Sequence, residues 1–308
     1  MRSQNDALEP QVFFSDGAAI SAESIAVCGG FTEAPEAAVS RIYLKLDATW
    51  LAHDVDKDFI VSVAYRDGVL FAVGRNGLVK TVGVRGSSFI PKNVKGRFRS
   101  YQVRECDDHG HLARVRAIGD DFFACGWGGQ VYRLANDSYQ KVDQGIDSLR
   151  DDTFLDIGGS TSNDIYAVGM DGLIAHFDGR RWSYLDSPTN NHLFSMRCLS
   201  SAEIVVVGAN GTLLHGNKKG WQSLGDDAPR ENFWDVCKLK QKLYITYGNT
   251  GLLSYYRGNW QDVALGDGAK PRTYRLDVAE DRLWSFGSSN LVVYDGKNWQ
   301  EVICPDNE

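Results

Sequence analysis

The sequence predicts an all-β fold, a seven-bladed β-propeller with four-stranded antiparallel blades. Its main support is an internal repeat: an apolar run ends in glycine, a second glycine usually follows after two intervening residues, and an apolar pair and an aromatic residue complete the unit. The first glycines of successive units stand at positions 29, 74, 126, 169, 208, 248 and 287, about 40 residues apart. Asn-Gly and Asp-Gly pairs between the apolar runs are strong hairpin signals. Units of this length with four short strands are typical of propeller blades.

The four C-terminal units are the most regular. Their apolar runs are residues 165–168, 204–207, 243–247 and 283–286, and their closing aromatic residues are Trp182, Trp221, Trp260 and Trp299. A further apolar stretch precedes each run, and we assign it to the innermost strand of the blade: residues 154–157, 193–196, 233–236 and 274–276. Because the tryptophans recur at one position of the repeat, we expect them to pack between blades.

The three N-terminal units are looser copies. Residues 70–73 and 122–125 are apolar runs that are followed by Phe89 and Tyr139 at the aromatic position. The first unit lacks the second glycine and reaches Trp50 only after an insertion at about residues 31–40. Residues 11–14 could form the inner strand of blade one or add a strand to blade seven, so the sequence leaves ring closure open. We predict an N-terminal lead over residues 1–10 and a single propeller domain over residues 11–308.

Composition narrows the partners and the compartment. The net charge of −7 repels phosphate backbones, so nucleic acid is not an expected partner, although the stretch of basic and aromatic residues at 85–104 could hold RNA if it is not simply a solvated loop. No apolar run is long enough for a membrane span, and the first residues do not resemble a signal peptide. The six cysteines form no Cys-x-x-Cys pair and are expected to be reduced and structural. These observations predict a cytoplasmic protein.

The Val-Gly-x-x-Gly-x-Ile and Gly-x-x-Trp patterns resemble the repeats of the bacterial YCF48-like and sialidase-type (BNR-like) propellers over nearly the whole chain. The chain departs from the sialidase repeat proper, because the Ser-x-Asp-x-Gly-x-x-Trp box is absent, and Trp234-Asp235 is a lone pair rather than a WD repeat. The resemblance implies the propeller fold. It also implies a binding role, most concretely that of an immunity protein against a secreted toxin, or that of an assembly factor for a larger complex.

Motifs for catalysis and metal binding are sparse. The segment from Cys106 to His111 holds cysteine, aspartate and histidine, but no second group stands at a ligand spacing. Nucleophile elbows, phosphate-binding loops and zinc-protease motifs are absent from the sequence. We therefore predict no catalytic residues, no metal site and no cofactor. A hydrolase or lyase site at the central channel, built from Asp156, Asp235 and Arg275, is the enzymatic alternative.

Acidic residues gather in the loops that lead from the outer strand of one blade to the inner strand of the next. Residues 53–58, 143–152, 186–192, 225–231 and 266–272 together hold twelve acidic and five basic side chains. Large aromatic residues stand where the inner strands begin, and aromatics ringed by charges suit a binding hot spot. The alternatives are that these loops are simply polar and that the aromatics pack in the core. The predicted partner-binding residues are Asp54, Asp56, Asp58, Asp151, Asp152, Asp226, Asp227, Glu231, Phe154, Trp234 and Tyr274.

The sequence as a whole predicts a non-enzymatic, protein-binding propeller that is a monomer by itself. Its partner is expected to be a basic protein, such as a toxin or effector domain, because an acidic face speeds the approach of a basic one.

Overall fold

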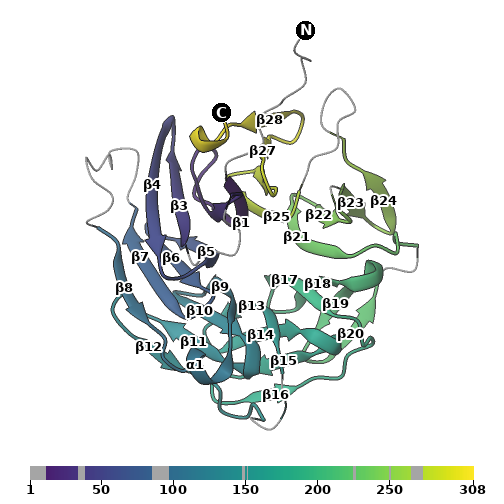
Figure 1. The fold of residues 1–308 in the computed structure, drawn as a ribbon. Helices are drawn as coiled ribbons and strands as arrows, with labels where there is room; N and C mark the ends of the chain where they lie inside the picture. Colours follow the sequence, from purple (N-terminus) through teal and green to yellow (C-terminus); the bar gives the residue numbers. More distant parts are fainter. Residues whose placement is uncertain are drawn as a thin grey trace.

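Seven four-stranded antiparallel sheets form a ring around a central channel, as Figure 1 shows for this computed structural model. The structure describes residues 12–33, 39–84, 97–147, 150, 152–224, 227–249, 251–264 and 273–308, so the predicted N-terminal lead lies outside the described residues. Each sheet is made of four consecutive strands, and the first strand of each sheet faces the channel. The prediction of a seven-bladed all-β propeller is therefore confirmed.

The strands follow the order of the repeats. Blade one holds β1 (Val12–Ala19), β2 (Ile25–Phe31), β3 (Val39–Leu46) and β4 (Thr49–Asp56). Blade two holds β5 (Ile60–Arg66), β6 (Val69–Gly74), β7 (Leu78–Gly83) and β8 (Arg99–Gln102). Blade three holds β9 (Leu112–Ile118), β10 (Asp121–Gly126), β11 (Val131–Leu134) and β12 (Tyr139–Lys141). Blade four holds β13 (Phe154–Thr161), β14 (Asp164–Gly169), β15 (Ile174–Phe177) and β16 (Trp182–Tyr184).

The last three blades have the same plan. Blade five holds β17 (Leu193–Ser200), β18 (Glu203–Gly208), β19 (Leu213–Asn217) and β20 (Gly220–Ser223). Blade six holds β21 (Phe233–Leu239), β22 (Lys242–Tyr247), β23 (Gly251–Tyr256) and β24 (Asn259–Asp262). Blade seven holds β25 (Arg275–Ala279), β26 (Arg282–Phe286), β27 (Leu291–Tyr294) and β28 (Trp299–Val302). The helical elements are α1 (Cys106–His109), η1 (Trp127–Gly129), η2 (Met170–Gly172), η3 (Ala209–Gly211) and η4 (Pro305–Asn307). In the part of the chain that the structure describes, no helix has the length and apolarity needed to span a membrane.

The two glycines of the repeat have different physical roles. Gly169 is extended, but a Cβ there would lie 1.8 Å from the carbonyl oxygen of Thr153, so it permits close approach to the inner strand. Gly172 has a φ of 73° and follows Asp171, whose φ is 53°, so the turn between β14 and β15 lies in the left-handed region that favours glycine and Asp or Asn. In the Gly-x-x-Gly pattern, the first glycine therefore allows a close packing contact and the second allows the turn.

Hydrophobic clusters lie between neighbouring blades. Ile118 and Phe123 of blade three form one cluster with Phe154, Phe177 and Trp182 of blade four. The indole of Trp182 is buried, and its Nε1 donates a hydrogen bond to the carbonyl of Val142 in the preceding blade, 2.8 Å away. Trp50, Trp221, Trp260 and Trp299 also pack against hydrophobic clusters, which confirms blade packing for the tryptophans of the repeat. Phe89, predicted at this position in the second unit, lies outside the described residues. All six cysteines are free, and all except the half-buried Cys198 are buried.

Among the described strands, none is shared between the first and the last blade where the ring closes. Residues 12–14 begin β1, the inner strand of blade one, which resolves the alternative that the sequence left open. The Phe14 amide donates to the carbonyl of Ser288 at 2.9 Å, and the Val12 amide donates to Asn307 Oδ1 at 3.0 Å. Arg41 and Tyr43 of blade one both donate to the carboxylate of Asp306 in η4. The C-terminal turn thus fastens blade seven to blade one.

We expect Asp306→Ala to lower the free energy of unfolding by about 1–2 kcal/mol, because Arg41 and Tyr43 lose a shared acceptor in a half-buried position. Denaturant unfolding measures the change. Asp137→Ala is the matched control, since Asp137 pairs with Arg99 on an exposed surface and should change the free energy by less than about 0.5 kcal/mol. Equal effects of the two substitutions would show that η4 does not hold the ring closed.

Candidate protein-binding surface and channel

The inner strands all begin on one side of the ring, which we call the top face. The loops from each outer strand to the next inner strand reach this face, and so do the turns η1, η2 and η3. The Trp127 amide donates to the carbonyl of His111 at 2.9 Å, and the Met170 amide donates to that of Thr153 at 3.1 Å. These bonds hold the turns against the starts of β9 and β13.

A β-bulge marks the beginning of six of the seven inner strands, where the register with the second strand shifts by one residue. In β21 the shift lies between Phe233 and Asp235, so Trp234 is the extra residue. Phe233 and Asp235 are buried, whereas Trp234 is partly exposed. Bulges re-aim side chains, and here the bulge brings a large aromatic residue to the mouth of the channel.

Three partly exposed aromatic residues from blades five, six and seven lie side by side along the channel mouth. We call Phe194, Trp234 and Tyr274 the aromatic rim. The ring centroids of Phe194 and Trp234 are 4.8 Å apart, and those of Trp234 and Tyr274 are 5.9 Å apart. The guanidinium of Arg275 lies 4.4 Å from the Tyr274 ring centroid and donates to the Trp234 carbonyl at 3.1 Å. The structure thus brings together the predicted residues Trp234 and Tyr274 and adds Phe194 to them.

Two exposed apolar residues on the same face escaped the sequence analysis. Trp127 is 45% exposed at the start of η1, and Met170 is 38% exposed at the start of η2. Both follow the first glycine of the repeat, a position that Arg75 and Ala209 occupy in other copies. The available signal was that two copies carry a large apolar residue at a position where other copies do not. The repeat pattern gave no indication that this position faces solvent.

The predicted acidic residues divide into surface and structural groups. Asp56, Asp227 and Glu231 are exposed on the top face. Asp54 is half-buried and pairs with Arg41 at 2.5 Å. Asp151 and Asp226 lie outside the described residues.

Three predicted binding residues have contacts within the fold that withdraw their side chains from the surface. The carboxylate of Asp58 is buried and accepts the amides of Phe59, Asn76 and Leu78 at 2.7–3.1 Å. Asp152 accepts the Tyr184 hydroxyl at 2.6 Å, and Phe154 is fully buried. Core packing, the alternative raised for the aromatics, is what the structure shows for Phe154. The carboxylates of Asp58 and Asp152 stabilise the loops through these hydrogen bonds. The prediction of a binding surface therefore depends on the other residues.

A ring of polar side chains, most of them buried, surrounds the channel at the position that follows the bulge in blades one to six and at the equivalent position of blade seven. Its members, at equivalent positions in blades one to seven, are Asp16, Ser62, Arg114, Asp156, Ser195, Asp235 and Arg275. Several of them accept a backbone amide of the next blade: Asp16 that of Val63 at 3.2 Å, Ser62 that of Val115 at 3.1 Å, Asp156 that of Met196 at 3.0 Å and Asp235 that of Leu276 at 2.9 Å. The inner strands are sheet edges, and these bonds satisfy amides that the sheets leave unpaired.

Arginines neutralise the carboxylates of this ring. Arg114 lies 3.1 Å from Asp16 and 3.5 Å from Asp156, and Arg116 makes two parallel 3.0 Å hydrogen bonds to Asp156. Burial acts to raise the pKa of Asp156, but the guanidinium groups of Arg116 and Arg114 outweigh it and hold that pKa well below the usual range. Arg197 and Arg116 lower the pKa of the buried Asp235 in the same way.

These contacts bear on the enzymatic alternative. Asp156 is fully buried and Asp235 is 1% exposed, and both carboxylates bridge neighbouring blades through backbone amides and arginines. The hydroxyl oxygen of Ser195 lies between the two carboxylates, 3.0 Å from Asp156 and 2.5 Å from Asp235, and can donate its proton to either. Arg275 is engaged with Trp234 and Tyr274. The geometry gives these three residues structural partners and no substrate-facing carboxylate.

The segment from Cys106 to His111 forms α1 and the start of β9. The Cys106 thiol is buried 3.4 Å from Gln130 Oε1, and burial raises its pKa to about 12. His109 Nε2 lies 3.3 Å from the Lys141 ammonium nitrogen. Among the described residues, no three His, Cys, Asp or Glu side chains are grouped closely enough to hold a metal ion.

Comparison with known proteins gives one curated relative and many structures of the same fold. No family model matches the chain. The sequence is 33% identical to Immune protein Tsi7 of Pseudomonas aeruginosa over 126 residues, which are 38% of this chain and 40% of that protein. The match therefore spans less than half the length of its relative.

The structural matches cover almost the whole ring. YCF48 bound to D1 peptide superposes with a TM-score of 0.68 at 14% identity, over 97% of this chain and 95% of that one. YCF48 from Cyanidioschyzon merolae gives 0.68 at 11% identity over 93% and 96%. The WD40 propeller domain of Doa1 gives 0.66 at 10% identity over 97% and 95%. At these identities the likeness shows the propeller fold, which the repeat had predicted through its resemblance to YCF48-like propellers.

Proposed function

We propose that this chain is an immunity protein, which binds a cognate toxin and blocks it without catalysing a reaction. The observation that carries the proposal is the aromatic rim: three neighbouring aromatic side chains at the channel mouth, two of them at bulges, that are partly exposed although they are large and apolar. The partial likeness to Immune protein Tsi7 supports an immunity role for the chain.

The top face has the anatomy of a binding hot spot. The aromatic rim supplies apolar area, and Trp127 and Met170 are further exposed apolar residues on blades three and four. Asp56, Asp227 and Glu231 are exposed charges on the same face. Aromatic anchors near the centre of an interface provide most of its binding energy, and charges around them govern the rate of encounter. We therefore propose a basic toxin domain as the partner.

The proposal includes a cytoplasmic setting and a monomeric free protein. The sequence supports both, through the reduced cysteines and the net charge of −7, which disfavours self-association. The alternative role, an assembly factor, depends on the likeness to YCF48. At 14% identity that likeness supports the shared fold and not a shared role.

Co-purification tests the proposal. The tagged chain is expressed with the products of the genes beside its own, each carried in an inactivated form, and recovered by affinity chromatography. We expect one stable, stoichiometric complex with a basic protein that is toxic when active. The proposal fails if no neighbouring product binds, or if the bound protein has no toxicity that this chain relieves.

A further inference from the structure

A cavity opens at the opposite end of the channel from the aromatic rim. Its walls are the C-terminal halves of the inner strands, from Gly17 in β1 through Arg116 in β9 to Asp277 in β25, and its volume is about 330 Å³. Such a volume is at the lower end of the range for small-molecule sites. The top-face proposal assigns no role to this cavity.

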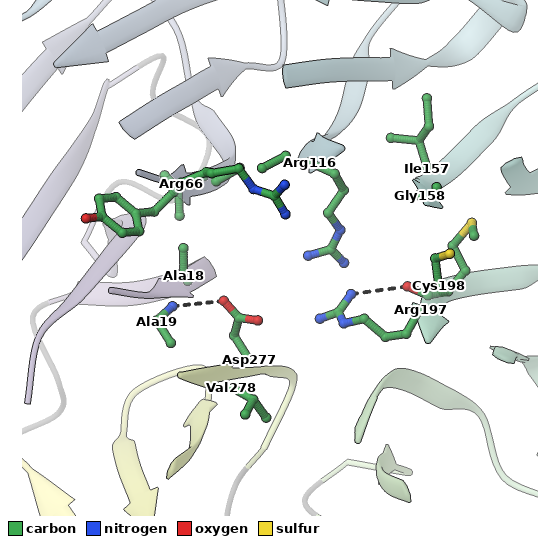
Figure 2. Close-up of a pocket in the computed structure, with 17 residues that line it drawn as sticks. Ala18, Ala19, Arg66, Arg116, Ile157, Gly158, Arg197, Cys198, Asp277 and Val278 are labelled. Atoms are coloured by element: carbon green, nitrogen blue, oxygen red, sulfur yellow. Dashed lines mark hydrogen bonds between the residues drawn. The ribbon is translucent and has the colours of Figure 1, made fainter. Parts of the chain in front are cut away.

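Three arginines converge on the cavity. Figure 2 shows the side chains of Arg66, Arg116 and Arg197 pointing toward one central space, with Asp277 on the other side of it. Arg66 is exposed at the end of β5, whereas Arg116 and Arg197 are only 16% and 17% exposed. Side chains this enclosed present few, well-defined donors to a ligand.

Existing contacts fix the two inner arginines. Arg116 uses Nε and Nη2 on Asp156, which leaves Nη1 directed away from that carboxylate. Arg197 donates from Nη2 to the carbonyl of Leu276 at 2.7 Å and lies 3.5 Å from Asp235. A ligand would therefore meet guanidinium groups that are already ordered, which lowers the entropic cost of binding.

The carboxylate of Asp277 lines the side of the cavity opposite the arginines, so the two sides carry opposite charge. Asp277 accepts the Ala19 amide at 2.9 Å. Among the described residues, no arginine or lysine nitrogen lies within 4.0 Å of its carboxylate. The arginine side thus suits an oxyanion, and the Asp277 side disfavours a second one.

We propose that this cavity binds a small molecule through a carboxylate or phosphate group held by Arg66, Arg116 and Arg197. Planar guanidinium groups match the oxygen geometry of both oxyanions. Enclosure strengthens these charged contacts relative to bulk water.

Isothermal titration calorimetry of the full chain tests this inference, with inorganic phosphate and succinate as probes and chloride at equal ionic strength as the reference. We expect saturable binding of at least one probe with a Kd of about 1 mM or tighter. Preference between the probes distinguishes a phosphate site from a carboxylate site. An absence of saturable binding by both probes would overturn the proposal.

Two substitutions test the location of the site without changing the polar side chains that surround the channel. Arg66→Gln should weaken binding about tenfold, because it removes an exposed charged donor. Asp277→Asn should tighten binding about threefold or more, because it removes a like charge while its amide oxygen can still accept the Ala19 amide. Arg257→Gln, in the turn between β23 and β24, is the control and should leave the Kd unchanged. Equal affinities of wild type and Arg66→Gln would contradict the proposed location.

Discussion

Asp156→Ala is expected to lower the free energy of unfolding by about 3–5 kcal/mol, as measured by denaturant titration. The substitution leaves the buried Arg114 and Arg116 without their shared carboxylate and removes the acceptor of the Met196 amide in the next blade. Loss of one partner from a buried ion pair costs far more than loss of both. Asp137→Ala, on an exposed surface, should cost less than about 0.5 kcal/mol.

The same carboxylate makes stability depend on pH with a defined sign. The pKa of Asp156 is lower in the folded chain than the value of about 3.9 for an unfolded aspartate. Its stabilising contribution is therefore fully present above about pH 4 and is lost as the pH falls further toward the folded value. Below pH 4 the difference in stability between wild type and Asp156→Ala should narrow. A difference that stays constant between pH 7 and pH 3 would contradict the ion-pair account.

Trp234→Ala is expected to weaken partner binding by about 2–4 kcal/mol, which is roughly 30-fold to 1,000-fold in Kd. Trp234 is the centre of the aromatic rim and contacts both Phe194 and Tyr274. Calorimetry or biolayer interferometry with the co-purified partner measures the loss. Ile303→Ala is the matched control, because Ile303 is 57% exposed on the segment after β28, at the outer edge of blade seven.

Stability must be separated from binding in that comparison. The Trp234 indole also donates to the Gly248 carbonyl at 2.7 Å, so the unfolding midpoint of each variant is measured alongside its affinity. Trp127→Ala provides a second test on the same face, because Trp127 is 45% exposed and its removal should spare the fold. Affinity within threefold of wild type for both variants would exclude the top face as the binding surface.

Most of the architecture could be predicted from the repeat, because each unit contains the residues that its own turns and packing contacts require. Gly172 adopts a left-handed turn, Gly169 allows the backbone of Thr153 to approach closely, and Trp182 packs between two blades. These three signals need no information from elsewhere in the chain. Ring closure through Asp306 could not be predicted, because it joins a C-terminal turn to blade one and has no counterpart in the other units.

The site was harder to predict because burial separates residues that look alike in sequence. Asp56 is exposed, whereas Asp58, two residues later, is buried as the acceptor for the next turn. The bulge that turns Trp234 toward the channel mouth is a shift of register, which an apolar pattern does not reveal. The arginine network joins Arg114 to carboxylates from two other blades, so its pairing follows only from the closed ring.

Survival of toxin-expressing cells tests the central proposal most directly. Cells that express the active toxin partner are given wild-type chain, Trp234→Ala or Ile303→Ala at equal soluble levels, and colony-forming units are counted. We expect wild type and Ile303→Ala to restore growth and Trp234→Ala to fail. Full protection by Trp234→Ala, or no protection by wild type, would contradict neutralisation of a toxin by the aromatic rim.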